Sequence, residues 1–518
     1  MTSPTVPPLP PKPAHQAPGA PDGDMAALAK GGRTNTVGFL IRLAGRIPFL
    51  IIAARFYGEE PLGRFASAFI LIEIIGLVCS LGEKRGLAQR LREGAHDDPA
   101  KETNLVYDGL LLGLLFSLVA VGGLLIFPQV MFPNGMNSPL DMWMVAAIPA
   151  FALTEILLAA QAYRYDIATT VRARAVVEPW AISIAVGVFL VFEATRDAGL
   201  ALAYIVSVFA ALLTAAWPFL RTYGLPKGWT PNARLMVKQS GAAFPLVGAD
   251  AIERGTRLLD IFILGLFVPP TAVGIYYVAQ QIASLPQKLK TSFEPILSPV
   301  ITKNLKIGNL SAIAAQVRQV GFWIIAVQLG IALVIAIPGE AVMGLWGPGY
   351  VAGTAALVFL LAAEVAASMA VVSESVLVYI AKKRNLLIST CILLFQAALT
   401  IALILTAKAY ALDPGFEAAM PAVALFFALA LSSLVKALVL KTLLKAPVSN
   451  WRWALVYAAA PAVVVGFIFT LLPEWVELVF GVPAILATYA FVIWRRGFGP
   501  EDRVLFRRNV ADEHPAKA

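Results

Sequence analysis

Apolar segments of about 20 residues recur along nearly the whole chain of 518 residues. A helix needs about 20 mostly apolar residues to cross the hydrocarbon core of a bilayer. Fourteen segments qualify, at approximately 35–57, 61–82, 105–127, 141–163, 175–194, 198–220, 240–267, 271–287, 319–338, 351–380, 386–407, 417–435, 453–472 and 475–494. The sequence predicts an all-α polytopic membrane protein of about 14 transmembrane helices, or of twelve or thirteen if the segments near 175–194 and at the C-terminal end do not all span.

The composition excludes a soluble globule of this length. Hydrophobic residues make up 59% of the chain and charged residues 14%, whereas soluble domains average about 45–50% and about 25%. The net charge of +9 does not indicate a nucleic-acid partner, because the basic residues lie between apolar segments. The two cysteines are far apart, and the three histidines lie outside the apolar segments, so we expect neither a disulfide framework nor a metal site.

The basic residues also predict an orientation. If the N-terminus is cytoplasmic, 33 of the 41 lysines and arginines fall in tails and connections on the cytoplasmic side. The positive-inside rule then predicts a multi-pass membrane protein with both termini in the cytoplasm. The outer connections are all short, which argues against a membrane glycan polymerase or ligase, since those enzymes usually carry an outer domain. We therefore expect that the protein is not an enzyme.

A weak internal repeat predicts two similar halves. A shift of 211 residues places 42–69 on 253–280, with Arg46 on Arg257 and Gly63 on Gly274. We therefore expect two pseudo-symmetric six-helix bundles and an extra C-terminal helix pair. The predicted parts are a disordered Pro-rich cytoplasmic tail (1–34), the two bundles (35–222 and 240–441), a cytoplasmic linker between them (223–239), the extra helix pair (451–494) and a basic cytoplasmic tail (495–518).

Charged residues inside two predicted spans are the candidate site. Such residues cost about 2.5–3.5 kcal/mol each on insertion scales and usually face a cavity. The first span carries Arg42 and Arg46, one helical turn apart. The seventh carries a stripe within an arc of about 120°, made of Asp250, Glu253, Arg254, Arg257 and Asp260. These groups either neutralise one another and join two half-bundles, or line a hydrated cavity for an anionic substrate.

The choice of arginine favours the cavity. A guanidinium binds phosphate oxygens in pairs and keeps its charge when buried, and no lysine is expected in mid-span. Two unpaired arginines on the first span, opposite two paired ones on the seventh, predict a cavity of net positive charge. Five glutamates in or near spans are interpreted as interfacial or packing residues, with proton or sodium coupling as the alternative: Glu73, Glu155, Glu178, Glu364 and Glu374. No phosphate-binding glycine loop is present, which argues against ATP hydrolysis by this chain, and we expect no cofactor.

The stretch from residue 31 to 69 resembles the first hairpin of bacterial polysaccharide exporters. Their signature is an apolar helix ending Ala-Arg-x-x-Gly-x-x-x-x-Gly-x-Phe, which is matched here by Ala54-Arg55-Phe56-Tyr57-Gly58 and then Gly63-Arg64-Phe65. These exporters belong to the multidrug/oligosaccharidyl-lipid/polysaccharide exporter superfamily, and the resemblance implies a location in the bacterial inner (plasma) membrane. Together with the topology, the resemblance covers residues 33–495, and it implies a V-shaped pair of bundles that work by alternating access.

The resemblance also implies a substrate. It implies that an oligosaccharide linked to undecaprenyl pyrophosphate is carried from the inner to the outer leaflet for surface polysaccharide or lipopolysaccharide (O-antigen) synthesis, beside glycan polymerase or transferase partners. The family's mid-span arginines map onto Arg42, Arg46 and Arg257.

Our hypothesis is that Arg42, Arg46, Arg254 and Arg257 bind the diphosphate while the polyprenyl tail stays among the membrane lipids. Asp250, Glu253 and Asp260 would line the cavity or relay charge. The alternatives are a cation-coupled multidrug exporter or a peptidoglycan-precursor flippase of the same superfamily.

Overall fold

A computed structural model describes most of the chain after residue 40. The described residues are 41–82, 86–88, 90–91, 98–231, 252, 255–256, 258–291, 301–302, 304–499 and 502. Throughout these ranges the regular structure is helical and contains no strand, which confirms the predicted all-α class. Ten described helices are long and apolar enough to cross a membrane. The count of fourteen stays a prediction.

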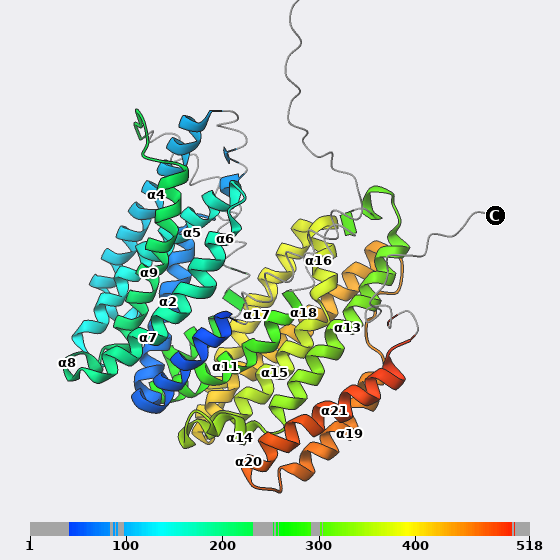
Figure 1. Cartoon of the computed structure of the whole chain (residues 1–518). Coiled ribbons are helices and arrows are strands. Elements are labelled where there is room, and N and C mark those ends of the chain that lie inside the picture. Colours follow the sequence, from blue (N-terminus) through cyan, green and yellow to red (C-terminus); the bar gives the residue numbers. More distant parts are fainter. Residues whose placement is uncertain are drawn as a thin grey trace, which may run out of the picture.

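The first half of the chain forms one group of helices (Figure 1). Residues 41–52 are helical and lead directly into a π-helical segment. The elements that follow are η1 (Ala53–Tyr57), α2 (Glu59–Cys79), α4 (Pro99–Ile126), η2 (Pro128–Val130), η3 (Pro139–Ala146), α5 (Ala147–Tyr163), α6 (Ile167–Val171), η4 (Arg172–Val177), α7 (Glu178–Val191), α8 (Glu193–Arg196) and α9 (Gly199–Thr222).

The second half forms another group, with the C-terminal helices packed on its outside (Figure 1). It begins with an apolar helix at Leu258–Phe267. Its further elements are α11 (Pro270–Thr291), α13 (Leu310–Ala336), α14 (Gly339–Gly344), η5 (Pro348–Gly353), α15 (Thr354–Ser368), α16 (Val371–Ile380), α17 (Lys382–Ala409) and α18 (Pro414–Leu444). The C-terminal elements are α19 (Ala454–Phe469), α20 (Glu474–Val476), η6 (Glu477–Gly481), α21 (Val482–Val492) and η7 (Ile493–Gly497).

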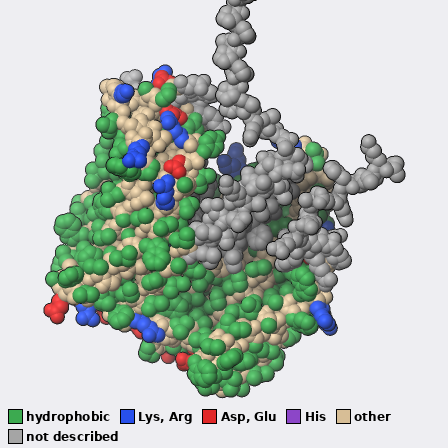
Figure 2. Space-filling model, in the orientation of Figure 1, with side chains coloured by type: hydrophobic (Ala, Val, Ile, Leu, Met, Phe, Trp, Pro, Cys, Tyr) green, Lys and Arg blue, Asp and Glu red, His purple; other side chains and the backbone are tan. Residues whose placement is uncertain are grey.

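The two groups form a V. They meet at the lower end of Figure 1, where α2 packs on α11, and diverge toward the upper end. Helices α19 and α21 pack on each other and on α13. On the face shown in Figure 2, hydrophobic side chains form a broad band, and the charged side chains lie toward its two ends. This pattern is that of a protein surrounded by hydrocarbon at mid-height, with polar surfaces at both ends.

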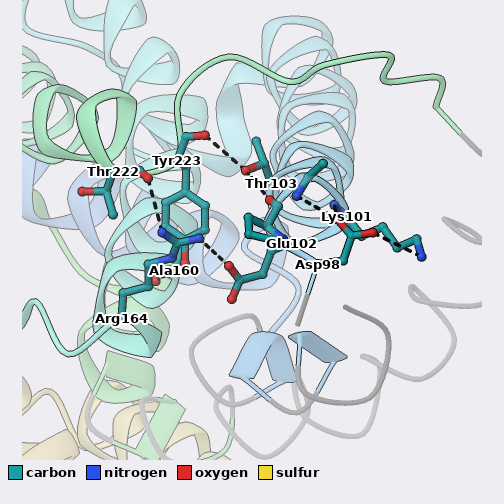
Figure 3. A network of polar contacts seen from close by, with 10 residues as sticks. Asp98, Lys101, Glu102, Thr103, Ala160, Arg164, Thr222 and Tyr223 are labelled. Atoms are coloured by element: carbon teal, nitrogen blue, oxygen red, sulfur yellow. Dashed lines mark hydrogen bonds and ion pairs between the residues drawn. The ribbon is translucent and has the colours of Figure 1, made fainter. Parts of the chain in front are cut away.

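Polar contacts join α4, α5 and α9 at the upper end of the first group (Figure 3). Arg164, which follows α5, forms an ion pair with Glu102 of α4, and its guanidinium lies 4.3 Å from the centre of the Tyr223 ring. Asp98 caps the start of α4 by accepting hydrogen bonds from the N–H groups of Ala100 and Lys101. The backbone and side-chain hydrogen bonds from Lys101 lower the pKa of Asp98.

The structure corrects two predictions about single spans. The segment predicted as one helix over 351–380 is broken between Ser368 and Val371, where Asn450 donates a hydrogen bond of 2.9 Å to the carbonyl of Met369. Lys436, predicted to lie in a connection, is buried on α18, because that helix continues to Leu444. It forms an ion pair of 2.9 Å with Glu374. The prediction that Lys436 lies in a cytoplasmic connection is therefore wrong.

The predicted boundaries of the tails, the linker and the two bundles stay predictions. The N-terminal tail and the part of the linker from 232 to 239 lie outside the described residues, as does most of the tail after 495.

Candidate functional site: a cavity between the two helix groups

A cavity of about 820 Å³ lies between the two groups. The first group lines it from helix 41–52, α2, α5, α6, η4, α7 and α9, and the second from α11, α15 and α18. On helix 41–52 the lining residues run from Arg42 to Phe49, about 10 Å along the helix axis at 1.5 Å per residue. On α5 the lining runs from Phe151 up to Tyr163, at the end of the helix. The cavity therefore reaches the end of the molecule where the basic connections lie, and its opposite end is aromatic.

Arg42 and Arg46 both line this cavity, as the sequence predicts for the first span. The Nε of Arg42 donates a hydrogen bond of 3.0 Å to the carbonyl oxygen of Arg174. The other predicted site residues of the seventh span, apart from Asp260, lie outside the described residues: Asp250, Glu253, Arg254 and Arg257. The binding role of all four arginines stays a prediction.

Arg174 is a cavity residue that the sequence analysis missed, since it was assigned to a cytoplasmic connection. The structure places it in η4, within the candidate span Ile167–Val191. Its Nη2 lies 2.5 Å from Glu155 and its Nη1 lies 2.7 Å from Glu178. All three side chains line the cavity. The spacing of Arg174 and Glu178, four residues apart on one helical face, was the signal available in the sequence.

The described cavity wall is richer in carboxylates than predicted. Glu73 and Glu364 line it together with Glu155 and Glu178, whereas its described arginines are Arg42, Arg46 and Arg174. These four glutamates line the cavity, and Glu155 and Glu178 also join α5 and α7 to η4 through Arg174. Four glutamates against three arginines do not produce the predicted excess of positive charge in the described part of the wall.

Asp260 lies one side chain away from the cavity. It is fully buried, and its carboxylate accepts hydrogen bonds from the hydroxyl of Tyr276 at 2.6 Å and from the backbone N–H of Ile261 at 2.8 Å. The amide of Gln280, which itself lines the cavity, donates to it at 3.2 Å. The geometry suits a satisfied buried carboxylate behind the cavity wall.

A second, mostly apolar space of about 500 Å³ adjoins the cavity. It lies between helix 41–52 and α11, and it extends to Leu345 and Trp346 beyond α14. Its lining residues include Leu43, Ile47 and Leu285. Several residues line both spaces, namely Arg42, Arg46, Phe49, Tyr277, Gln281 and Ser284. The two arginines therefore lie where a cavity lined by seven charged side chains meets a mostly apolar space.

The two groups close on each other at the end of the molecule beyond the aromatic lining. Helices α2 and α11 cross there at Gly63 and Gly274: a Cβ on Gly63 would lie 1.7 Å from the carbonyl oxygen of Pro270, and one on Gly274 would lie 2.0 Å from that of Glu59. These are the two glycines that the 211-residue shift aligns. Only glycine permits so close an approach of two backbones.

Hydrogen bonds to backbone carbonyls reinforce this closed end. Arg55 of the first group donates to the carbonyl of Leu345 in the second, through Nε at 2.9 Å and Nη2 at 2.7 Å. The amide of Asn134 donates to the carbonyls of Gly265 and Val268 at 3.1 and 3.2 Å. These carbonyls lie at helix ends, where backbone acceptors are unsatisfied by the helix itself.

A family model and several solved structures match this chain. The model of the family described as "Polysaccharide biosynthesis protein" matches residues 28–305. A search of curated protein sequences found no significant match.

Among solved structures, the lipid II flippase MurJ in an inward closed conformation is 11% identical, with a TM-score of 0.66 over 89% of this chain and 99% of that one. A multidrug resistance MATE family transporter in an inward-facing conformation is 14% identical, with a TM-score of 0.64 over 78% and 98%. An outward-facing conformation of such a transporter gives a TM-score of 0.55 at 14% identity, over 81% and 96%. These likenesses establish the fold, a two-bundle architecture shared with transporters of the MOP superfamily.

The family match covers more than half of the chain, and the fold agrees with the resemblance of the first hairpin. The chain belongs to the polysaccharide biosynthesis protein family and is a multi-pass membrane protein with the MOP-superfamily transporter fold.

Proposed function

We propose that the protein is a flippase that moves a polyprenyl-diphosphate-linked oligosaccharide across the inner membrane by alternating access, for surface polysaccharide or lipopolysaccharide synthesis. The observation that carries the proposal is the position of Arg42 and Arg46, which line both the cavity with its charged side chains and the adjoining apolar space.

Such a substrate has three chemically different parts, and each needs its own surroundings. The polyprenyl chain needs apolar surface or lipid, the sugars need a hydrated space, and the diphosphate between them needs fixed cations. The adjoining apolar space would take the polyprenyl chain and the cavity would take the sugars. The two shared arginines lie between them, where the diphosphate would be. Guanidinium groups suit the diphosphate because each can donate two parallel hydrogen bonds to phosphate oxygens.

The conformation fits the loading step of this cycle. The cavity reaches the end of the molecule that carries the basic connections, while Gly63 and Gly274 cross at the other end. The positive-inside rule assigns the basic end to the cytoplasm. The cavity would then accept the lipid-linked sugar from the cytoplasmic leaflet, and a rocking of the two groups would open the far end.

A cation-coupled multidrug exporter is the second candidate, and the cavity glutamates favour it. Glu73, Glu155, Glu178 and Glu364 could attract a cationic drug or a coupling ion. Two of them are occupied by Arg174 through the ion pairs described above, which reduces their attraction for a second cation. The peptidoglycan precursor is also a lipid-linked diphosphate, and the same arginines would bind it. An assay is therefore needed to distinguish this substrate from the oligosaccharide.

Substitution of the two shared arginines tests the proposal. In a strain lacking the gene, Arg42→Ala and Arg46→Ala should each abolish display of the surface glycan at normal protein levels. We expect at least a tenfold loss, since a hydrogen bond to a charged group contributes about 1.5–3 kcal/mol. Arg196→Ala, at an exposed position on α8, is the matched control and should export normally.

Normal glycan display in both arginine variants would overturn the headgroup role. A deletion that changes drug susceptibility and leaves glycan display intact would favour the exporter. Loss of viability on deletion, with lipid II accumulating on the cytoplasmic side, would favour the peptidoglycan precursor.

A further inference from the structure

A π-helical turn ahead of Pro179 leaves one backbone carbonyl of the cavity wall without its helical partner. In η4 the N–H of Glu178 bonds to the carbonyl of Ala173, five residues back, instead of the carbonyl four residues back. In the same pattern the next residue, Pro179, would bond to the carbonyl of Arg174. Proline has no N–H. The π-helical pattern therefore supplies no backbone donor to the carbonyl oxygen of Arg174.

Arg42 supplies the missing donor from another helix. Its Nε lies 3.0 Å from this carbonyl oxygen. Close packing makes the contact possible: a Cβ on Gly45 would lie 3.0 Å from the Cβ of Pro179 and 3.0 Å from Cδ1 of Trp180. Residues 42 and 45 lie on one face of their helix, so the same approach that seats Gly45 on Pro179 brings Arg42 to the carbonyl.

The acceptor itself is held in place. The side chain of Arg174 bridges Glu155 of α5 and Glu178 of α7, and its guanidinium lies 4.6 Å from the centre of the Phe151 ring. The hydroxyl of Ser183 also donates to the carbonyl of Gly45, which joins α7 to helix 41–52 a second time. Because two carboxylates balance its charge, the side chain of Arg174 is a poor ligand for phosphate. The part of Arg174 that acts here is its backbone carbonyl, which accepts the hydrogen bond from Arg42.

We propose that the π-helical turn closed by Pro179 is a positioning element for Arg42. The turn presents a carbonyl that binds Nε and so fixes the plane of the guanidinium relative to the diphosphate of a lipid-linked sugar. The inference rests on the proposed function, because it assumes that Arg42 binds this headgroup. Pro179 is thus a positioning residue: it acts through Arg42 and needs no contact with the substrate.

The guanidinium plane matters because phosphate recognition by arginine is directional. An arginine that must be ordered on binding loses side-chain freedom, whereas one already held at Nε has lost it in the free protein. Typical ordering costs per side chain correspond to roughly a 2- to 12-fold change in affinity. This range is the size of effect that the turn should have.

Pro179→Ala tests the inference directly. The alanine supplies an N–H that can bond to the carbonyl of Arg174 and compete with Arg42. Binding of undecaprenyl diphosphate to the purified full-length protein in lipid nanodiscs should weaken by roughly 2- to 12-fold. Pro461→Ala, which also removes a proline from inside a helix but on the C-terminal pair, is the matched control and should bind unchanged.

A double-mutant cycle separates positioning from a general structural effect. In the Arg42→Ala background, Pro179→Ala should cause no further loss, because the group that it positions is gone. An equal loss with and without Arg42 would overturn the inference, as would wild-type affinity in Pro179→Ala. If Arg42→Ala itself binds normally, the proposed headgroup role fails as well, which is a different outcome.

Arg42→Lys gives a second test that leaves the turn intact. A single ammonium group cannot bond to the carbonyl and also present two parallel donors to phosphate. Binding should therefore fall nearly as far as in Arg42→Ala. Wild-type affinity in Arg42→Lys would show that charge alone is sufficient and would overturn the positioning role.

Discussion

The contacts between the two helix groups at the closed end differ in chemistry from the contacts within each group around the cavity. At the closed end the contacts across the interface include a glycine crossing, at Gly63 and Gly274, and hydrogen bonds from Arg55, Asn134 and Tyr350 to backbone carbonyls. Around the cavity, Arg174 is paired with carboxylates of its own half of the chain. The ion pairs Arg164–Glu102 and Lys436–Glu374 also join residues of one half.

This difference suits a molecule whose halves must separate and rejoin. A hydrogen bond exchanged for one with water contributes only about 0.5–1.5 kcal/mol, or about 1.5–3 kcal/mol when one group is charged. Removing one partner of a buried ion pair costs about 3–5 kcal/mol. Strong pairs within a half keep each group rigid, and weaker contacts across the closed end can break in every cycle.

The largest expected effect comes from the glycine crossing. Gly63→Ala would place a methyl group 1.7 Å from a backbone carbonyl oxygen, so the closed end cannot form as it stands. We expect loss of glycan export and a population shift toward the open outer end, because the clash exists only when α2 and α11 are in contact. Distances between spin labels at the exposed positions Arg196 and Tyr410, in a variant without native cysteines, would report the opening.

Gly122→Ala on α4 is the matched control, since a Cβ there meets no atom within 4 Å. It should export normally and keep the wild-type distances. Wild-type behaviour of Gly63→Ala would show that the crossing does not close the outer end.

The next largest effect concerns the buried pairs. Arg174→Ala leaves Glu155 and Glu178 without their cation, and we expect a loss of about 3–5 kcal/mol in the free energy of unfolding, visible as a lower melting temperature in detergent. Lys101→Ala breaks an exposed pair with Asp98 and should leave the melting temperature nearly unchanged, because solvent screens exposed ion pairs.

Charge removal sharpens this prediction. The triple variant Arg174→Ala/Glu155→Gln/Glu178→Gln should recover much of the lost stability, because it leaves no buried carboxylate behind. If the triple variant is as unstable as Arg174→Ala alone, packing of the arginine side chain on Phe151 is the dominant contribution.

The smallest effect is expected at Asn134. Asn134→Ala removes hydrogen bonds to Gly265 and Val268 across the closed end, which should shift the open fraction by about 0.5–1.5 kcal/mol in the same distance measurement. Asn137→Ala is a close control from the same loop, because its amide donates to Pro61 within its own half. Equal shifts in both variants would show that these carbonyl contacts do not hold the outer end shut.

The apolar segments and the charges within them made much of the molecule predictable. A span of about 20 apolar residues and an excess of basic residues on one side are properties of a short stretch of chain, and bilayer thickness acts on each stretch separately. Arg42 and Arg46 were found for the same reason, since a guanidinium in an apolar helix is costly wherever its neighbours lie.

What the sequence determined alone is therefore the membrane setting, the helical class and the arginines of the first span. The tertiary structure decided which charges face one cavity: it turned Arg174 inward through a π-helical turn, paired it with Glu155 and Glu178, and placed Asp260 behind Gln280. It also decided that Gly63 and Gly274 touch. The rotation of each helix about its axis, the positions of helix breaks and the packing partners of each side chain depend on residues distant in the chain. Hydropathy and local spacing do not contain that information.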